Sequence, residues 1–299
     1  MKLIGTIYQV ELPSRMIAIK TYHRILYLYF HTGQLSIFKR YLFEGVYIHL
    51  EYNEERTFLK NGILAHPVDF VYQIYYFNIY KKISYYDKNE LNNSLSRFLS
   101  SLGNMMFLDL EMTMPSYHQS GKDHTVEIIQ AGYLLVDANG DEITRYSHYI
   151  KPVKNPSLNT RTIKFLNLKP TSFYAEAISY EQFYADFKEI IENYHPTIII
   201  YGKNDSLVLE HSYAINLKKS LTKQTRFVNL CKLVRDYYNL RNDIGLFKLY
   251  QTYYQNETLQ VHDAFNDCEV TKEVFKAFQK EVNHRTDFFP QIKKIMEPK

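Results

Sequence analysis

The sequence has few of the residues that mark secreted, zinc-binding or membrane-spanning proteins. It contains only two cysteines, Cys231 and Cys268, and no Cys-x-x-Cys pair, which argues against a disulfide framework and a structural zinc site. No segment reaches the roughly 18 uninterrupted apolar residues of a membrane span, and Gln9 and Glu11 interrupt the N-terminus before any signal-peptide core forms. We therefore expect a soluble, cytoplasmic protein.

Tryptophan is absent, yet 28 tyrosines and 19 phenylalanines make the chain rich in aromatic side chains. With 45% hydrophobic residues among 299 positions, the chain can bury a substantial core, and its length favours two domains. The net charge of +4 is unevenly spread, because residues 1–100 contain 12 Lys+Arg against 8 Asp+Glu, whereas residues 101–299 contain 24 of each. This asymmetry predicts a polyanion-facing N-terminal domain before a neutral one.

Short runs of β-branched and aromatic residues, separated by turn residues, follow one another through the first 80 positions. They predict strands over residues 3–12, 16–22, 25–30, 35–42, 45–52, 57–64 and 70–80. So many closely spaced strands indicate a small all-β barrel of the oligonucleotide-binding (OB) type.

An OB barrel stacks bases on aromatic rings and contacts phosphates with basic side chains. The cationic candidates are Lys20, Arg24, Lys39 and Arg40. The aromatic candidates are Tyr22, Tyr27, Tyr29, Phe30 and Phe38. The alternative is that these rings fill the barrel core.

The remaining chain alternates predicted strands and helices. Residues 86–103 read as a helical connector, and residues 104–282 as one domain before a tail over 283–299. Within that domain, three strands at about 107, 127–136 and 143–150 form a meander. Helices over 179–194, from 205 and over 261–282 alternate with strands over 197–201 and 226–233. This order predicts a mixed sheet flanked by helices, with the strand at 107 in its centre.

Two acids, Asp109 and Glu111, lie two residues apart in the apolar segment 107–113. On a β-strand this spacing points both side chains to one face of the sheet. Neighbouring carboxylates repel each other unless a cation lies between them. Because Asp-x-Glu is a common triplet, the hypothesis of a metal site needs further ligands.

Three residues from other motifs can join this pair. Asp205 follows the apolar strand 197–201, where it could equally be a helix N-cap. Asp267 occupies the first place of an otherwise apolar helix face, and a buried acid there needs a partner. His262 stands five residues earlier, in the turn before that helix, although a lone histidine is more often structural.

The segments Phe-Leu-Asp-Leu-Glu-Met-Thr at 107–113, Tyr-Gly-Lys-Asn-Asp at 201–205 and His-Asp-Ala-Phe-Asn-Asp at 262–267 together resemble the three motifs of the DEDDh 3′–5′ exonuclease superfamily. This superfamily has a ribonuclease H-like fold and includes ribonuclease T and polymerase proofreading subunits. The resemblance covers residues 104–280. A sister group of exonucleases has a tyrosine four residues before the final acid. This chain has Asp263 at that position, so it resembles the group that uses a histidine and not the group that uses a tyrosine. The chain departs from the family pattern at Cys268 and over residues 155–178.

The resemblance implies that four acids hold two Mg²⁺ or Mn²⁺ ions and that His262 is the general base. We also expect Thr113 to contact nucleic acid. The four acids are Asp109, Glu111, Asp205 and Asp267. Hard oxygen ligands favour these ions over zinc. The implied function is 3′–5′ hydrolysis of single-stranded DNA or RNA from a free 3′ end, releasing nucleoside monophosphates. The alternatives are oligoribonuclease-like processing of short RNA and a nucleic-acid-binding module with reduced catalysis.

Overall fold

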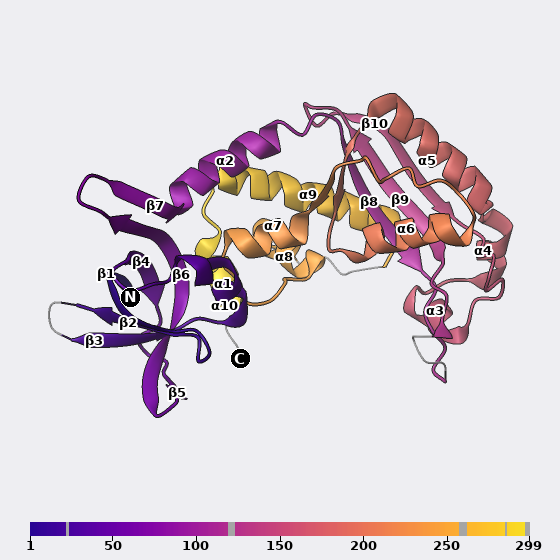
Figure 1. Cartoon of the computed structure of the whole chain (residues 1–299). Coiled ribbons are helices and arrows are strands. Elements are labelled where there is room, and N and C mark those ends of the chain that lie inside the picture. The colour runs from indigo at the N-terminus through magenta and orange to yellow at the C-terminus, as the bar shows by residue number, and fades with distance from the viewer. Residues whose placement is uncertain (22–23, 119–122, 257–261, 285, 297–299) are drawn as a thin grey trace. The chain divides into compact units, whose positions relative to one another are not determined.

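The computed structural model describes residues 1–21, 24–118, 123–256, 262–284 and 286–296, and Figure 1 shows its helices and strands. The chain forms two compact units. The first comprises residues 1–97, 234–243 and 282–299, and the second comprises residues 98–233 and 244–281. None of the helices in the described ranges is both long and apolar enough to span a bilayer.

A closed five-stranded barrel forms the centre of the first unit. Neighbouring strands pair in the cyclic order β1 (Lys2–Glu11), β2 (Met16–Lys20), β3 (Ile25–Tyr29), β6 (Ile63–Phe77) and β4 (Tyr47–Tyr52). The β3–β6 pair is parallel and the other pairs are antiparallel. This closed barrel, with a helix between its third and fourth strands, confirms the predicted OB-like architecture.

One predicted strand of the barrel, 35–42, is wrong. This segment forms helix α1 (Thr32–Phe38) and the 3-10 helix η1 (Lys39–Tyr41). The helix is started by a reciprocal cap, in which His31 Nδ1 accepts a hydrogen bond from the Gln34 backbone while the Gln34 side chain accepts one from the His31 backbone. Leu35, Phe38 and Leu42 then pack at helical spacing against the barrel core.

A second predicted strand, 57–64, is also wrong, because the chain reverses within it. Asn61 and Gly62 both have positive φ, 48° and 79°, as a two-residue hairpin turn requires. The turn joins β5 (Phe58–Lys60) to the start of β6. Farther along, β7 (Lys82–Asp87) pairs with β6, and helix α2 (Lys88–Ser100) follows it.

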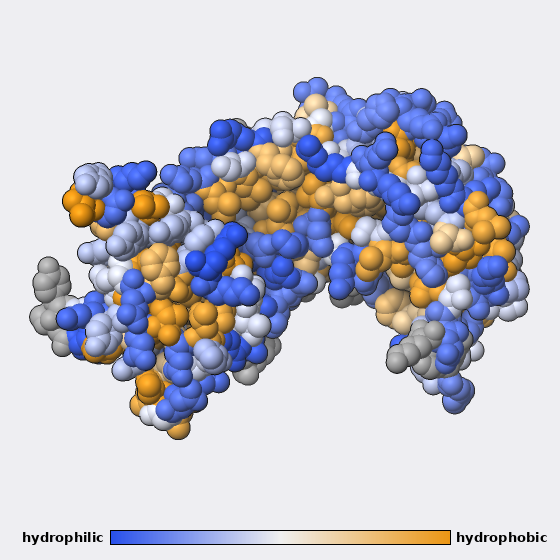
Figure 2. All heavy atoms as spheres, viewed as in Figure 1, coloured by the Kyte–Doolittle hydropathy of each residue, from blue (hydrophilic) through white to orange (hydrophobic). Residues whose placement is uncertain are grey.

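The aromatic candidates of the barrel have different locations. Phe30 and Phe38 are completely buried in the barrel core, so the core alternative is right for these two. Tyr27 and Tyr29 are half-buried on the outer face of β3. Tyr22 lies outside the described residues. Figure 2 shows apolar side chains gathered at the ends of the β5 and β6–β7 hairpins, where Leu59 and Ile79 are exposed.

A five-stranded mixed sheet forms the second unit. Its strands lie in the order β10 (Glu142–Tyr149), β9 (Ile128–Val136), β8 (Met105–Met112), β11 (Thr197–Ile200) and β12 (Phe227–Asn229). The first three form the predicted antiparallel meander, and β11 and β12 run parallel to β8. The strand that carries Asp109 and Glu111 is therefore central, as predicted.

Helices cover both faces of this sheet (Figure 1). Phe183 and Phe187 of α5 pack in one core cluster with Leu108 of β8, whereas Phe275 of α9 contacts Phe107 from the other side, with ring centroids 5.6 Å apart. Besides α2, the helices of the second unit, or shared with the first, are α3 (Thr160–Phe165), α4 (Pro170–Glu176), α5 (Tyr180–Tyr194), α6 (Asn204–Ile215), α7 (Leu230–Tyr237), α8 (Leu246–Tyr254) and α9 (Ala264–Val282). Helix α10 (Phe289–Met296) belongs to the first unit.

The predicted strand 226–233 is only partly right. β12 ends at Asn229, and α7 begins at the next residue. The Asn229 side chain accepts a hydrogen bond from the backbone of Lys232 at 3.0 Å, which is the geometry of a helix N-cap. A cap in the middle of the apolar run thus converts its second half into helix.

Candidate active site

Strand β8 carries Asp109 and Glu111 on the face that α9 covers. Leu108 and Leu110 point to the opposite face and pack in the core cluster with α5. The period of two residues along a strand therefore separates the acids from the apolar side chains, as the sequence predicted.

Asp205 reaches β8 from the first turn of α6. The pairing of β11 with β8 extends to Ile199 opposite Phe107, and β11 ends one residue later. Beyond this point the backbone N–H of Leu110 donates to Oδ1 of Asp205 at 3.2 Å. The Asp205 carboxylate thus takes the place of a strand partner at Leu110, the residue between Asp109 and Glu111.

Asp267 approaches from the first turn of α9, which packs unusually close to the sheet. Gly132 of β9 pairs with Asp109. A Cβ atom at Gly132 would lie 2.5 Å from the backbone of Ala264 and Phe265. Only glycine permits this approach. Carboxylate oxygens of Asp109, Glu111 and Asp267 consequently lie within 4.8 Å of one another.

Burial and mutual repulsion make these carboxyl groups hard to ionise. Burial is the main cause of the raised pKa of Asp109, and Asp205, Asp267 and Glu111 add repulsion. Burial and then Asp267 raise the pKa of Glu111 to about 7. Burial raises the pKa of Asp205 to about 6, although backbone N–H donors, including that of Leu110, oppose the rise. Converging acids of this kind fit a divalent cation with hard oxygen ligands.

His262 lies in the turn immediately before α9, in the left-handed conformation with φ of 53°. Its half-buried ring packs on Phe165 at the end of α3, with ring centroids 4.6 Å apart. Within the described ranges the imidazole shows no hydrogen bond to an acid of the cluster.

Two further residues position the start of α9, and the sequence analysis did not assign them this role. Asp263 accepts a hydrogen bond from the backbone of Asn266 at 3.0 Å and therefore caps the helix. Its other oxygen accepts from the Gln130 side chain at 2.6 Å. Gln130 pairs with Glu111 across β8 and β9. The signal in the sequence was an N-cap acid one residue before the helix.

The other predicted contacts with nucleic acid have varied surroundings. Thr113 is buried, and its hydroxyl accepts a hydrogen bond from the Glu127 backbone at 3.0 Å. On the barrel, Arg15 and Lys60 each lie over the Tyr29 ring, 5.0 Å from its centroid. The four predicted cations are all exposed: Lys20 at the end of β2, Arg24 beside Glu54 at 3.9 Å, and Lys39 and Arg40 on η1.

The chain is similar in sequence or in fold to several known nucleases. KapD of Bacillus subtilis (strain 168), a probable 3′–5′ exonuclease, is 27% identical over 179 residues, which cover 59% of this chain and 85% of KapD. The nuclease domain of 3′hExo, a DEDDh family member bound to rAMP, superposes with a TM-score of 0.53 at 15% identity, over 60% of this chain and 94% of that domain. Cell-death related nuclease 4 (CRN-4) gives 0.50 at 19% identity, over 61% and 64% of the two chains.

The family model of the ribonuclease T type, described as exonuclease, matches residues 106–275. These residues include all three motifs and make up more than half of the 299-residue chain. The match confirms the resemblance to the DEDDh group that the motifs indicated. This protein therefore belongs to the exonuclease family and is a hydrolase that acts as a nuclease.

Proposed function

We propose that this nuclease removes nucleoside monophosphates one at a time from the 3′ end of single-stranded DNA or RNA. The observation that carries this proposal is the convergence of Asp109, Glu111 and Asp267 within 4.8 Å, with Asp205 anchored beside them on Leu110. The 3′–5′ direction is supported by the similarity to KapD, itself a probable 3′–5′ exonuclease.

In this proposal the four acids hold two Mg²⁺ or Mn²⁺ ions. When bound, such ions polarise a phosphodiester and lower the pKa of water, which are the two needs of phosphodiester hydrolysis. The acids come from three elements, β8, α6 and α9, whose positions are fixed by Leu110 and Gly132. Their carboxylates are therefore held together before any ion binds, which lowers the cost of organising the site.

His262 is the proposed proton acceptor. Its backbone conformation and its contact with Phe165 hold the imidazole at the start of α9, five residues from Asp267. Histidine is the side chain that most often acts as a general acid or base in enzymes, so His262 is suited to take a proton from the attacking water.

The barrel of residues 1–85 is proposed to hold the strand from which nucleotides are removed. Tyr29 offers a half-buried ring beside the guanidinium of Arg15 and the ammonium of Lys60. Tyr27 lies on the same outer face of β3, and Lys20 and Arg24 are exposed nearby in the sequence. Rings for stacking and cations for phosphates are what a sequence-tolerant single-strand site requires.

A nuclease assay tests the proposed function. DNA and RNA oligonucleotides labelled at the 5′ end, both single- and double-stranded, are digested with Mg²⁺ or with EDTA, and the products are resolved by length. Wild type is expected to shorten single strands stepwise in Mg²⁺ only. Asp109→Asn should abolish cleavage, and His262→Ala should slow it about 10²–10⁴-fold.

The matched control is Glu192→Gln, which removes an exposed carboxylate from α5 and should cleave like wild type. Stable labelled substrate with wild-type protein and Mg²⁺ would contradict the proposal. Selective cleavage of RNA of only a few nucleotides would instead support the oligoribonuclease-like alternative.

A further inference from the structure

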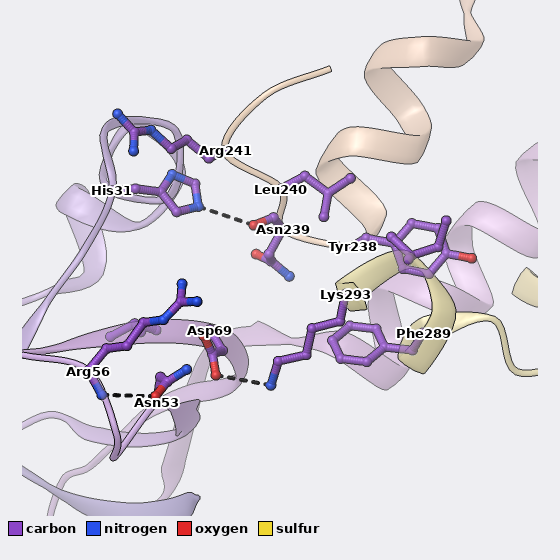
Figure 3. Close-up of a pocket in the computed structure, with 12 residues that line it drawn as sticks. His31, Asn53, Arg56, Asp69, Tyr238, Asn239, Leu240, Arg241, Phe289 and Lys293 are labelled. Atoms are coloured by element: carbon purple, nitrogen blue, oxygen red, sulfur yellow. Dashed lines mark hydrogen bonds and ion pairs between the residues drawn. The ribbon is translucent and has the colours of Figure 1, made fainter. Parts of the chain in front are cut away.

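The first unit contains a pocket of about 160 Å³ that the proposed active site does not use. Figure 3 shows it between the barrel, the segment 234–243 and helix α10, all of which belong to the same compact unit. Three stretches that are far apart in the sequence thus contribute to one pocket.

The walls of this pocket are held in place by their own contacts. His31 Nε2 bonds the backbone oxygen of Asn239 at 3.2 Å, and because its Nδ1 accepts from Gln34, Nε2 is the donor. Lys293 of α10 pairs with Asp69 at 3.0 Å and with Glu51 at 3.4 Å. The pocket is therefore formed before any ligand binds.

Positive charge exceeds negative charge around the pocket. Asp69 is the acid that lines it, and Lys293 already pairs with this acid and with Glu51. Arg56 and Arg241 add two guanidinium groups, and neither makes an ion pair within the part of the chain that the structure describes. In Figure 3 the Arg56 guanidinium points into the pocket, whereas Arg241 lies at the rim beyond His31.

A buried donor in the pocket also lacks an acceptor. The side-chain nitrogen of Asn239 makes no hydrogen bond to any residue that the structure describes, although only 4% of Asn239 is exposed. It lies near enough to the Tyr86 phenol to affect the pKa of that group, but not in hydrogen-bonding geometry. Figure 3 shows this nitrogen aimed into the pocket. Because an unpaired buried donor is costly, an oxygen ligand is expected at this position.

We propose that this pocket binds the phosphate group of a nucleotide. Arg56 and Asn239 donate to phosphate oxygens, and the half-buried ring of Phe289 provides an apolar wall for the nucleoside. A phosphate has several oxygens in a compact group and can accept from a guanidinium fork and an amide together. The choice of a nucleotide rests on the proposed function, which supplies two sources: a nucleotide within the bound strand or a released monophosphate.

Binding measurements on the full chain in EDTA, where no hydrolysis is expected, test the inference. The first probe is a 20-nucleotide oligothymidylate with a 5′ fluorescein, followed by anisotropy over a range of salt concentrations. The second probe is AMP, followed by the shift in thermal midpoint. The variants are Arg56→Ala and Asn239→Asp, the latter nearly isosteric and tolerant of the φ of 54° at this position. Arg97→Ala is the control, since among the described residues Arg97 hydrogen-bonds to Asn93 and Ser94 of its own helix and to no other.

If a strand nucleotide occupies the pocket, Arg56→Ala weakens oligothymidylate binding about fivefold and lowers the slope of log affinity against log salt by about 0.7, the value for one phosphate of a single strand. If free monophosphate occupies it, the AMP-induced shift is lost in Arg56→Ala and Asn239→Asp while strand binding is kept. Either result supports the inference. Both variants behaving like Arg97→Ala with both probes would overturn it, whereas absence of Mg²⁺-dependent cleavage by wild type would count only against the proposed function.

Discussion

Gly132 determines how closely α9 approaches the central strands. Gly132→Ala places a Cβ atom 2.5 Å from the backbone of Ala264 and Phe265, so the helix start must move away from β8, and Asp267 moves with it. We expect a loss of stability of about 1–3 kcal/mol from overpacking. We also expect a fall in cleavage rate of about 10²-fold, as for a 1 Å misplacement of a reacting group.

Urea unfolding and the oligonucleotide assay measure these two effects. Gly245→Ala is the matched control, because a Cβ atom there meets nothing within 4 Å and its φ of −62° suits alanine. If Gly132→Ala keeps full cleavage activity, the close approach of α9 is not what positions Asp267.

The buried carboxyl group of Asp109 lowers the stability of the folded protein at neutral pH. This carboxyl group is buried among three other acids, so its ionisation is unfavourable and costs folding free energy at neutral pH. Asp109→Asn removes the charge and keeps the shape. In EDTA the variant should therefore have a higher thermal midpoint than wild type.

Addition of Mg²⁺ should reverse this order. Wild type should gain about 2.7 kcal/mol when Mg²⁺ is at 100 times its dissociation constant, whereas Asp109→Asn should gain far less. Asp141→Asn, at an exposed turn, is the control and should respond like wild type. An equal response to Mg²⁺ in wild type and Asp109→Asn would contradict a role of Asp109 in metal binding.

At the scale of elements, the cap of α1 also fastens the segment 234–243 to the barrel. Burial lowers the pKa of His31 to about 4, and the neighbouring charges of Arg241 and Arg15 add to this effect. Unfolded chains take up a proton near pH 6.5, where the folded histidine stays neutral. The stability that this neutral histidine provides is therefore complete above about pH 6.5 and is lost as the pH falls toward 4.

His31→Asn keeps an N-cap side chain but removes the titrating group. Between pH 7.5 and 5.0, hydrogen exchange in α1, corrected for its intrinsic pH dependence, should show wild type losing about 1–2 kcal/mol of protection. The asparagine variant should lose little of its protection. An equal loss in both proteins would assign the pH dependence to other groups.

Features set by neighbouring residues could be predicted from the sequence, whereas features set by contacts between distant segments could not. The period of two at Asp109 and Glu111 and the apolar stripe that begins at Asp267 are local patterns, and the structure brings those acids together. The segments 35–42 and 57–64 were misassigned because a His31–Gln34 cap and an Asn-Gly turn overrode apolar runs that look like strands. The close approach at Gly132 was beyond prediction, because it joins segments about 130 residues apart.

At the scale of the whole molecule, the acids of the proposed active site all belong to the second unit, and the barrel belongs to the first. If the barrel holds the strand while the acids cleave it, damage to the barrel should weaken substrate binding and leave the chemical step intact. The ring of Tyr29 is the position to change, because Arg15 and Lys60 flank it and Phe58 lies 5.8 Å away.

Tyr29→Leu keeps apolar bulk against Phe58 but removes the surface on which a base can stack. Stacking on an aromatic ring contributes about 1–3 kcal/mol per base, so KM for a 20-nucleotide strand should rise about tenfold while kcat stays the same. Tyr29→Phe is the control and should match wild type, because it keeps the ring. A trinucleotide offers few bases beyond the cleaved bond, so its kcat/KM should be equal in all three proteins. A fall in kcat, or an equal rise in KM for the trinucleotide, would contradict a role of the barrel in holding the strand.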